Sequence, residues 1–376
     1  MTDILVIELE PTHYKTDLWN CVNTSKRYNV KILYTEKKNW APDAGHDFKT
    51  LPDMNHEIIV HNGRGFFDIF RSLAFVINYL IKKAPKLVYV VGYSKPVSAI
   101  VIFLLTLLRQ PFVVFVDKFN IYKPPSDFLR FKYIIREILR RFVFQNSLAV
   151  LTCGDVGVKT AIAAGCSFEK LVAFPYYVSL ERLLSDKPKN IPKQCVRDLR
   201  TTCTILFFSG RMIERKGLVT LLQALESIVD DKEWVLWIEG DGPNLASYQS
   251  TAMSLGISSR CRWLGFQQYY NHSWLLRNSD VVIVPSSQDN WGIVVGEAII
   301  LQKVVVSTFD TGSAKEMLGG YSKGHYFRTG DVCDLTLTLR KVMRDEFLLI
   351  DRLESADRLG SSVSPREIIE SIILKF

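Results

Sequence analysis

Short apolar, β-branched runs alternate along the chain with longer segments whose apolar residues follow helical spacing. In the first half, seven such runs are predicted to be strands: residues 4–8, 30–34, 58–61, 87–91, 112–116, 148–151 and 171–174. The segments 67–83 and 96–109 between them carry the helical pattern. This alternation is typical of βαβ units, in which a helix connects two parallel strands. The first half is therefore predicted to be Rossmann-like.

The alternation stops at residues 181–202, which are rich in Lys, Arg, Asp and Pro, as an interdomain linker is. It then restarts with five predicted strands: residues 205–208, 234–239, 261–264, 281–284 and 304–307. We therefore predict an α/β protein with two Rossmann-like domains, residues 1–183 and 184–376. The last segment, 364–376, is predicted to be an amphipathic helix that could pack back on the first domain.

Composition narrows the class of protein. At 376 residues and 48% hydrophobic, the chain can fill two cores of ordinary size, which excludes a disordered protein. The net charge of +8 favours ligands that carry phosphate, such as nucleotides, nucleic acids or anionic lipids. The seven cysteines include no Cys-x-x-Cys pair, which favours reduced thiols over a disulfide framework or a zinc site.

Two segments bear on location. Residues 1–11 carry acidic side chains where a signal peptide needs positive charge. The apolar segment 97–108 is shorter than the roughly 20 residues that a membrane-spanning helix requires. We therefore expect a cytoplasmic protein, which could lie peripherally on the inner face of the cytoplasmic membrane.

The stretch 281–297 is the strongest candidate for a ligand site. An apolar run ends at Pro285, and a turn that contains Gly292 leads into a helical pattern. Ligands of open α/β sheets bind beyond the carboxyl ends of the strands, and Asp289 and Glu297 bracket this turn. Carboxylates accept hydrogen bonds from sugar hydroxyls, whereas bare backbone N–H groups suit phosphates. The alternative is structural: an N-cap at Asp289 and a first-turn helix carboxylate at Glu297.

Two further turns follow predicted strands of the second half. Gly210 and Arg211 end one strand, and Lys216 follows five residues later, before a helical pattern. Two cations at a strand-to-helix turn can hold a diphosphate, although an ordinary solvated basic turn has the same composition. The next turn contains Gly240 and Asp241, where the missing Cβ allows the backbone to approach a ligand closely.

The order and spacing of these motifs resemble those of the retaining GT4-type glycosyltransferases of the GT-B fold, in which two Rossmann-like domains face each other across a cleft. The resemblance covers nearly all of the second half and extends to Gly312-Ser313-Ala314-Lys315-Glu316 and Gly330-Asp331. It implies that a nucleotide-diphospho-sugar binds the second domain. The implied donor-binding residues are Gly210, Gly240, Asp241, Asp289, Asn290, Trp291, Gly292, Ile293 and Glu297.

By the same resemblance, Arg211 and Lys216 hold the diphosphate and help it to leave, and Glu297 accepts the ribose hydroxyls. The family usually has Glu where this chain has Asp289, a side chain one methylene shorter, so the resemblance leaves the donor sugar open. Many relatives carry a His after a strand of the first domain, where this chain has Asp117. A departing phosphate oxygen can take the acceptor's proton, so Asp117 is assigned as an orienting group. The chain contains no Asp-x-Asp motif, and we expect no metal and no cofactor besides the donor.

On the acceptor side, His13, Tyr14 and Lys15 follow the first strand and resemble an acceptor loop of some of these enzymes, although an ordinary surface loop fits equally well. The helical segment 126–144 has Lys132, Arg136 and Arg140 at four-residue steps, which suits either an anionic membrane surface or a core-packed helix with a solvated basic face. Aromatic residues are not interleaved with its basic ones, so nucleic acid is not an expected partner.

The predicted function is retaining transfer of a hexosyl or N-acetylhexosaminyl group to a glycan or lipid-linked acceptor, in the synthesis of a surface polysaccharide such as lipopolysaccharide or O-antigen, or of another glycoconjugate. A nucleotide-sugar epimerase or phosphorylase of the same fold is the alternative enzyme. A catalytically silent paralogue that only binds is the alternative of a different class.

Overall fold

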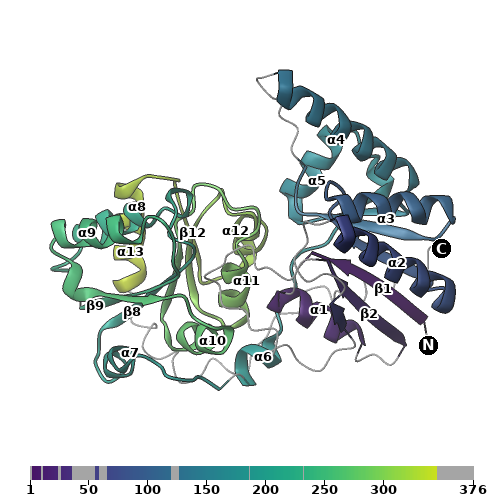
Figure 1. Ribbon diagram of the computed structural model, residues 1–376. Coiled ribbons are helices and arrows are strands. Elements are labelled where there is room, and N and C mark those ends of the chain that lie inside the picture. Colours follow the sequence, from purple (N-terminus) through teal and green to yellow (C-terminus); the bar gives the residue numbers. More distant parts are fainter. Residues whose placement is uncertain are drawn as a thin grey trace. The chain divides into compact units, whose positions relative to one another are not determined.

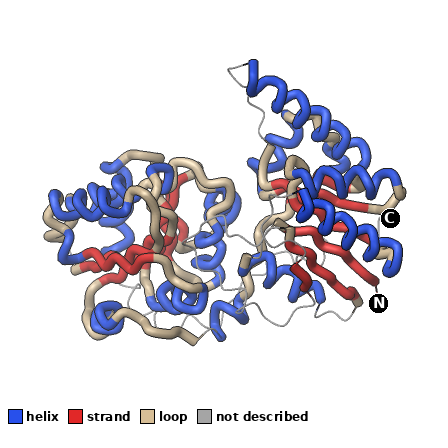
Figure 2. The backbone as a smooth tube through the Cα atoms, viewed as in Figure 1, coloured by secondary structure: helices blue, strands red, loops and turns tan. Residues whose placement is uncertain are grey.

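The structure is a computed structural model that describes residues 2–9, 12–23, 27–35, 56–58, 66–119, 127–185, 187–231 and 233–344. The described residues up to Tyr177 form one compact unit and those from Val178 form a second. Each unit is a parallel sheet with helices on both faces (Figure 1 and Figure 2). The predicted helix at 364–376 lies outside the described residues. Within the described part of the chain, no helix has the length and apolarity needed to cross a membrane.

The N-terminal unit contains a seven-stranded sheet of order β3-β2-β1-β4-β5-β6-β7. Its strands are β1 (Thr2–Glu8), β2 (Tyr28–Tyr34), β3 (His56–Ile58), β4 (Leu87–Val91), β5 (Phe112–Val116), β6 (Ala149–Thr152) and β7 (Leu171–Ala173). Its helices are α1 (His13–Asn23), α2 (Phe66–Lys83), α3 (Pro96–Leu107), α4 (Asp127–Asn146) and α5 (Gly154–Ala163). All seven predicted strands are present, and the first three each begin two residues earlier than expected.

Burial on both faces explains why these strands are continuously apolar. In β4, Val88 and Val90 pack into the cluster that α2 and α3 cover, while Tyr89 between them points to the other face and meets Trp19 of α1 with ring centroids 4.8 Å apart. Figure 1 shows α1 on the opposite side of this sheet from α2 and α3. The two-residue period of the strand thus supplies both cores of the unit.

The C-terminal unit contains a six-stranded sheet of order β10-β9-β8-β11-β12-β13. Its strands are β8 (Thr204–Ser209), β9 (Trp234–Glu239), β10 (Cys261–Gly265), β11 (Val281–Val284), β12 (Val304–Thr308) and β13 (Gly324–Phe327). Its helices are α6 (Leu180–Ser185), α7 (Lys193–Asp198), α8 (Leu218–Glu226), α9 (Leu245–Ser254), α10 (Tyr269–Asn278), α11 (Ile293–Ile300), α12 (Gly312–Met317) and α13 (Val332–Arg344). Single 3-10 turns lie at Glu214–Lys216, Ser258–Arg260 and Leu318–Gly320 of this unit, and another lies at Phe168–Lys170 of the N-terminal unit.

The topology of the second sheet places the candidate site. The chain runs outward from β8 through β9 to β10 and then returns to the centre to continue with β11 beside β8. The strand order therefore reverses between β8 and β11, and such a switch point opens a crevice at the carboxyl ends of the strands. The segments after β8 and β11 are the ones that carry Arg211, Lys216 and Asp289.

Two segments whose composition suggests solvent exposure contain buried side chains. The linker-like stretch 181–202 contains α7 and most of α6, and the buried side chains of Leu183 and Cys195 belong to the core of the C-terminal unit. In α4, Arg140 is buried and paired with Glu137, whereas Ile134, Ile135 and Ile138 are exposed. Arg140 therefore does not contribute to a solvated basic face, and the side chain of Lys132 lies outside the described part.

Candidate functional site

The glycines of the C-terminal unit bring three strand ends into backbone contact. Gly217 and Gly240 have φ of 71° and 127°, in the left-handed region that glycine tolerates. A Cβ at Gly217 would lie 1.9 Å from the carbonyl oxygen of Pro285, and one at Gly240 would lie 1.9 Å from that of Gly210. The turns after β8, β9 and β11 therefore pack main chain against main chain, and only glycine fits at these two contacts.

Arg211 and Lys216, the predicted diphosphate clamp, differ in their surroundings. The guanidinium of Arg211 is exposed, and within the described residues no hydrogen bond or ion pair to it is found. The ammonium of Lys216 instead forms an ion pair with the carboxylate of Asp289, and both side chains are largely buried. The structure thus brings together two predicted site residues that are 73 positions apart in the chain.

Asp289 does not cap the helix that follows it. The N-cap of α11 is Gly292, with φ of 75°. Asp289 instead forms a β-bridge with Thr311, and its backbone N–H donates to the carbonyl of Asp310 over 3.1 Å. The structural alternative for Asp289 is therefore wrong, because its backbone is held by a neighbouring loop and its side chain by Lys216.

The start of α11 offers backbone donors for an anion. The first N–H groups of an α-helix have no acceptor within the helix, and α11 begins at Ile293. A Cβ at Gly292 would lie 2.5 Å from Cγ2 of Thr311, so this turn is also closely packed. Trp291 is buried, and its carbonyl accepts a hydrogen bond from the hydroxyl of Ser313. Trp291 is therefore part of the scaffold of this turn.

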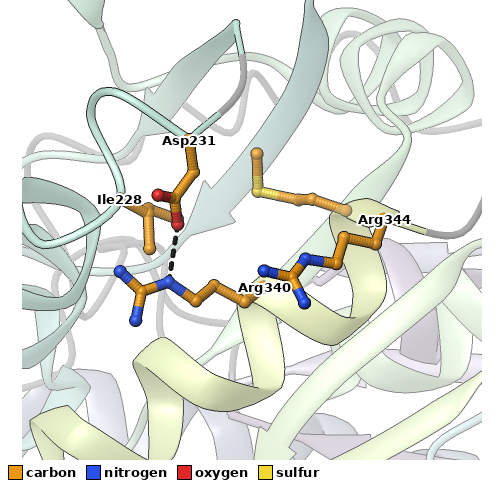
Figure 3. Close-up of a pocket in the computed structure, with 5 residues that line it drawn as sticks. Ile228, Asp231, Arg340 and Arg344 are labelled. Atoms are coloured by element: carbon orange, nitrogen blue, oxygen red, sulfur yellow. Dashed lines mark hydrogen bonds and ion pairs between the residues drawn. The ribbon is translucent and has the colours of Figure 1, made fainter.

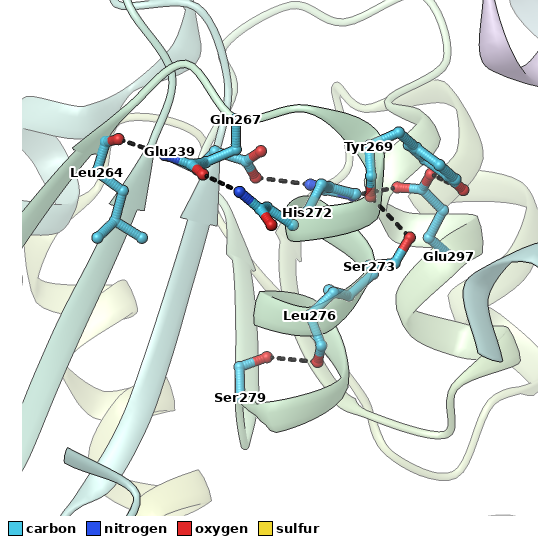
Figure 4. A network of polar contacts seen from close by, with 10 residues as sticks. Glu239, Leu264, Gln267, Tyr269, His272, Ser273, Leu276, Ser279 and Glu297 are labelled. Carbon is cyan, nitrogen blue, oxygen red and sulfur yellow. Dashed lines mark hydrogen bonds and ion pairs between the residues drawn. The ribbon is translucent and has the colours of Figure 1, made fainter. Parts of the chain in front are cut away.

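Glu297 lies at the centre of a buried polar network (Figure 4). Its side chain is 1% exposed, and Oε1 accepts a hydrogen bond from the hydroxyl of Tyr269 over 3.0 Å. Oε2 lies 3.0 Å from Nε2 of His272, and Nδ1 of the same imidazole lies 2.6 Å from Oε2 of Glu239. Glu297 is beyond the first turn of α11, so the alternative role of a first-turn carboxylate is wrong.

The protonation of His272 follows from these neighbours. Burial alone would lower the pKa of the imidazole, but the charges of Glu239 and Glu297 and their hydrogen bonds raise it well above its ordinary value. Neither His272 nor Glu239 was identified from the sequence. Glu239 directly precedes the glycine turn, and His272 is three residues from Tyr269 on the buried face of α10, which are the signals that could have found them.

The predicted acceptor-side residues gather beyond β1 and β5 of the N-terminal unit. The ammonium of Lys15 binds the buried carboxylate of Glu8 over 2.6 Å. The Tyr14 ring meets the Tyr176 ring edge-on with centroids 4.4 Å apart, and the Tyr176 hydroxyl donates to Oδ1 of Asp117 over 2.5 Å. The ring of His13 lies 5.4 Å from that of Tyr14. Glu8 and Tyr176 are members of this cluster that the sequence analysis missed.

Burial shapes the titration of this cluster. Burial raises the pKa of Glu8, and Lys15 only partly offsets this effect. Burial also disfavours the charged form of Lys15, but the carboxylate of Glu8 outweighs it and raises the pKa of the ammonium. The ion pair therefore satisfies both groups internally, and the ammonium of Lys15 is less available to a ligand than that of a solvated lysine.

Two other features of the described residues lie apart from these sites. No group of three or more His, Cys, Asp or Glu side chains in this part of the chain is arranged to hold a metal ion. A cavity of about 130 Å³ lies where α13 packs against α8, lined by Ile228, Asp231, Arg340, Met343 and Arg344 (Figure 3). No predicted site residue lines it, and Nε of Arg340 donates to Asp231 over 2.5 Å.

Comparison with known proteins finds a family model that matches part of the chain, mostly in the C-terminal unit. Residues 196–362 match the model of the family described as Glycosyl transferases group 1. A curated relative, the lipopolysaccharide core biosynthesis glycosyltransferase LpsE of Rhizobium meliloti, is 28% identical over 171 residues, which is 46% of this chain and 45% of LpsE. The chain spans less than half the length of the first curated relatives it matches.

Solved structures extend the likeness to both units. HepE of Anabaena in complex with UDP and glucose superposes with a TM-score of 0.74 at 16% identity and covers 100% of both chains. WaaG, a glycosyltransferase involved in lipopolysaccharide biosynthesis, superposes with a TM-score of 0.67 at 16% identity and covers 98% of this chain and 99% of WaaG. At these identities the likeness shows the fold alone, and it confirms the predicted GT-B fold.

Proposed function

We propose, from the match of residues 196–362 to the glycosyl transferases group 1 family, that the protein transfers a sugar from a nucleotide-diphospho-sugar to a glycan or lipid-linked acceptor with retention of configuration. The observation that carries the proposal is that Lys216, from the turn after β8, pairs with Asp289, from the turn after the adjacent strand β11. Arg211 lies in the same turn as Lys216, and α11, which carries the buried Glu297, begins just after Asp289. This edge of the second sheet combines donors for a diphosphate with acceptors for hydroxyls.

Each group has a distinct part in donor binding. Arg211 and the first N–H groups of α11 bind phosphate oxygens, and Lys216 exchanges its ion pair with Asp289 for the diphosphate. Asp289 is then available to a sugar hydroxyl. Glu297 accepts ribose hydroxyls on the lone pairs that Tyr269 and His272 leave, because a carboxylate has about four acceptor sites.

The transfer itself breaks the bond between the anomeric carbon and the diphosphate oxygen. The acceptor oxygen forms the new bond on the same face of the sugar, and its proton passes to the departing phosphate oxygen. Arg211 and Lys216 stabilise the charge that develops on the diphosphate. Asp117, held by the Tyr176 hydroxyl over 2.5 Å, orients the acceptor hydroxyl. The cations take the role of a divalent metal, so transfer proceeds without one.

The biological setting is proposed from the relatives. LpsE and WaaG are named for lipopolysaccharide biosynthesis, so the proposed product is a surface polysaccharide or a related glycoconjugate. HepE was solved with UDP and glucose, so UDP-sugars are the first donors to test. For a lipid-linked acceptor, α4 supplies a membrane-facing surface in which exposed Ile134, Ile135 and Ile138 lie beside exposed Arg141.

A panel of nucleotide sugars tests the proposal. Thermal shift selects the donor that stabilises the protein most, and NMR of the product made from that donor and a mixture of glycan acceptors reports the anomeric configuration. The proposal predicts a product with the donor's configuration, formed equally well in EDTA. Isomerised sugar formed without acceptor would indicate an epimerase, and transfer to phosphate alone would indicate a phosphorylase. A protein that neither binds nor turns over any nucleotide sugar would indicate a catalytically silent paralogue that acts as a binding subunit.

A further inference from the structure

Three elements of the C-terminal unit place an imidazole between two carboxylates. His272 of α10 lies between Glu239, at the end of β9, and Glu297 of α11 (Figure 4). The three residues are 8%, 5% and 1% exposed, so water does not compete for these contacts. A neutral imidazole has one N–H donor, whereas an imidazolium has two. Two ionised carboxylates on its two ring nitrogens are both satisfied only by the imidazolium.

We propose that the imidazolium of His272 is a positioning residue for the donor nucleotide, holding the Glu297 carboxylate in the orientation that receives the ribose hydroxyls. The inference rests on the proposed function, because it needs Glu297 to contact the donor. It assigns to His272 no contact with the donor and no part in bond making.

The geometry defines what His272 holds in place. Tyr269 occupies one lone pair of Oε1 of Glu297, and Nε2 of His272 occupies one of Oε2, so the plane of the carboxylate is set from two sides. Because the carboxylate is held from two sides in a buried position, a small rotation would turn its remaining lone pairs away from a ligand. The shorter contact, 2.6 Å to Glu239, anchors the imidazole to the strand end next to Gly240.

Two carboxylates and two aromatic rings face the imidazole. Glu239 faces the imidazole from β9 and Glu297 from α11, while the rings of Tyr269 and of Phe207 on β8 lie 5.6 Å and 5.9 Å from it. Arg182 of α6 lies over the Tyr269 ring at 4.9 Å. The two carboxylates raise the pKa of His272 well above its ordinary value despite burial, so the charged form persists through neutral pH.

Ribose-dependent binding distinguishes positioning from a general structural role. UDP, GDP, ADP and CDP are titrated calorimetrically into wild type, His272→Leu and His272→Gln at pH 7, together with the 2′,3′-dideoxy form of the tightest binder. His325→Gln, on β13 of the same unit, is the matched control. Wild type and the control should prefer the ribose form by about 10- to 100-fold, the range for hydrogen bonds to a charged group.

The expected result is a loss confined to ribose. In His272→Leu the preference for the ribose form should shrink to a few-fold while the affinity for the dideoxy form is kept. His272→Gln, whose amide nitrogen is a single donor atom in place of the two ring nitrogens, should recover part of the preference. A full preference in His272→Leu would overturn the inference and leave the proposed function standing. If wild type binds none of the four diphosphates, the proposed function is overturned, and the inference with it.

A spectroscopic measurement on the wild-type protein covers the case in which His272→Leu does not fold. In a ¹⁵N-histidine-labelled sample, the signals absent from His272→Gln should report protons on both ring nitrogens at pH 7. Donor affinity should weaken as the pH rises through the loss of that second proton. A neutral imidazole at pH 7 would overturn the inference whatever the variants do.

Discussion

The left-handed glycines after β4 and β9 and before α8 have different surroundings in the two units. In the C-terminal unit, a Cβ at Gly217 or Gly240 would lie 1.9 Å from a neighbouring carbonyl oxygen, so main chain packs on main chain. In the N-terminal unit, Gly92 after β4 has φ of 71°, but a Cβ there would meet no atom within 4 Å. The chemistry of the N-terminal edge comes instead from paired side chains, Lys15 with Glu8 and Tyr176 with Asp117.

The difference indicates which ligand each edge suits. A closely packed main chain with exposed N–H groups binds a group of invariant shape, and a diphosphate is such a group. An edge lined by tyrosines and internally paired charges suits a larger, mostly uncharged surface, such as the rings of a glycan. We therefore expect changes on the donor side to be severe and changes on the acceptor side to be graded.

The largest effect is expected from adding a methyl group at the donor edge. Gly240→Ala places a Cβ 1.9 Å from a carbonyl oxygen and should lower the free energy of unfolding by more than about 4 kcal/mol. Gly92→Ala, with the same sign of φ but open space, should cost only about 1–2 kcal/mol. Urea denaturation of both variants measures the difference. Equal costs would show that the two edges are not built differently.

A smaller effect is expected at the acceptor edge. Tyr176→Phe removes the hydrogen bond to Asp117 and should lower kcat by about 10- to 100-fold, the range for one hydrogen bond to a charged group. Calorimetry should find donor affinity unchanged, because the change lies in the other unit. A matching loss of donor affinity would contradict the assignment of this cluster to the acceptor.

The buried imidazole makes the stability of the protein depend on pH. The pKa of His272 is raised in the folded state, so its stabilising contribution is complete below about pH 6.5, the ordinary histidine value, and declines as the pH rises toward the folded-state pKa. Within that window the free energy of unfolding of wild type should fall relative to His272→Gln by up to about 1.4 kcal/mol per pH unit. Urea denaturation of both proteins at several pH values measures this difference. If the two free energies of unfolding change in parallel with pH, His272 is not charged in the folded state.

The smallest effect is expected at the cavity between α8 and α13. Arg340→Ala removes a partly exposed ion pair with Asp231, and such pairs contribute about 0–1 kcal/mol. Transfer should be unaffected, because no predicted site residue lines this cavity. A loss of transfer with intact folding would extend the functional surface well beyond the strand ends.

Features encoded by neighbouring residues could be predicted from the sequence, whereas contacts between distant residues could not. The glycine turns were found because a left-handed φ at a strand end is encoded by one residue. The strand β13 was missed because Gly324–Phe327 is an edge strand with three half-buried residues and has no continuous apolar run. The pairing of Lys216 with Asp289 and the His272 network join residues 25 to 73 positions apart on separate elements. Only the folded sheet brings such residues together.

The edge beyond β8 and β11 is the proposed binding site for the diphosphate of a nucleotide sugar. Its most direct test is calorimetric titration of wild type, Arg211→Ala and the exposed α13 control Lys341→Ala with the nucleotide sugar selected by thermal shift and with the parent nucleoside. We expect Arg211→Ala to lower the affinity for the nucleotide sugar by about 10- to 100-fold and to leave the affinity for the nucleoside unchanged. Lys341→Ala should bind both ligands as wild type does. Equal affinity of Arg211→Ala and wild type for the nucleotide sugar would contradict the proposed site.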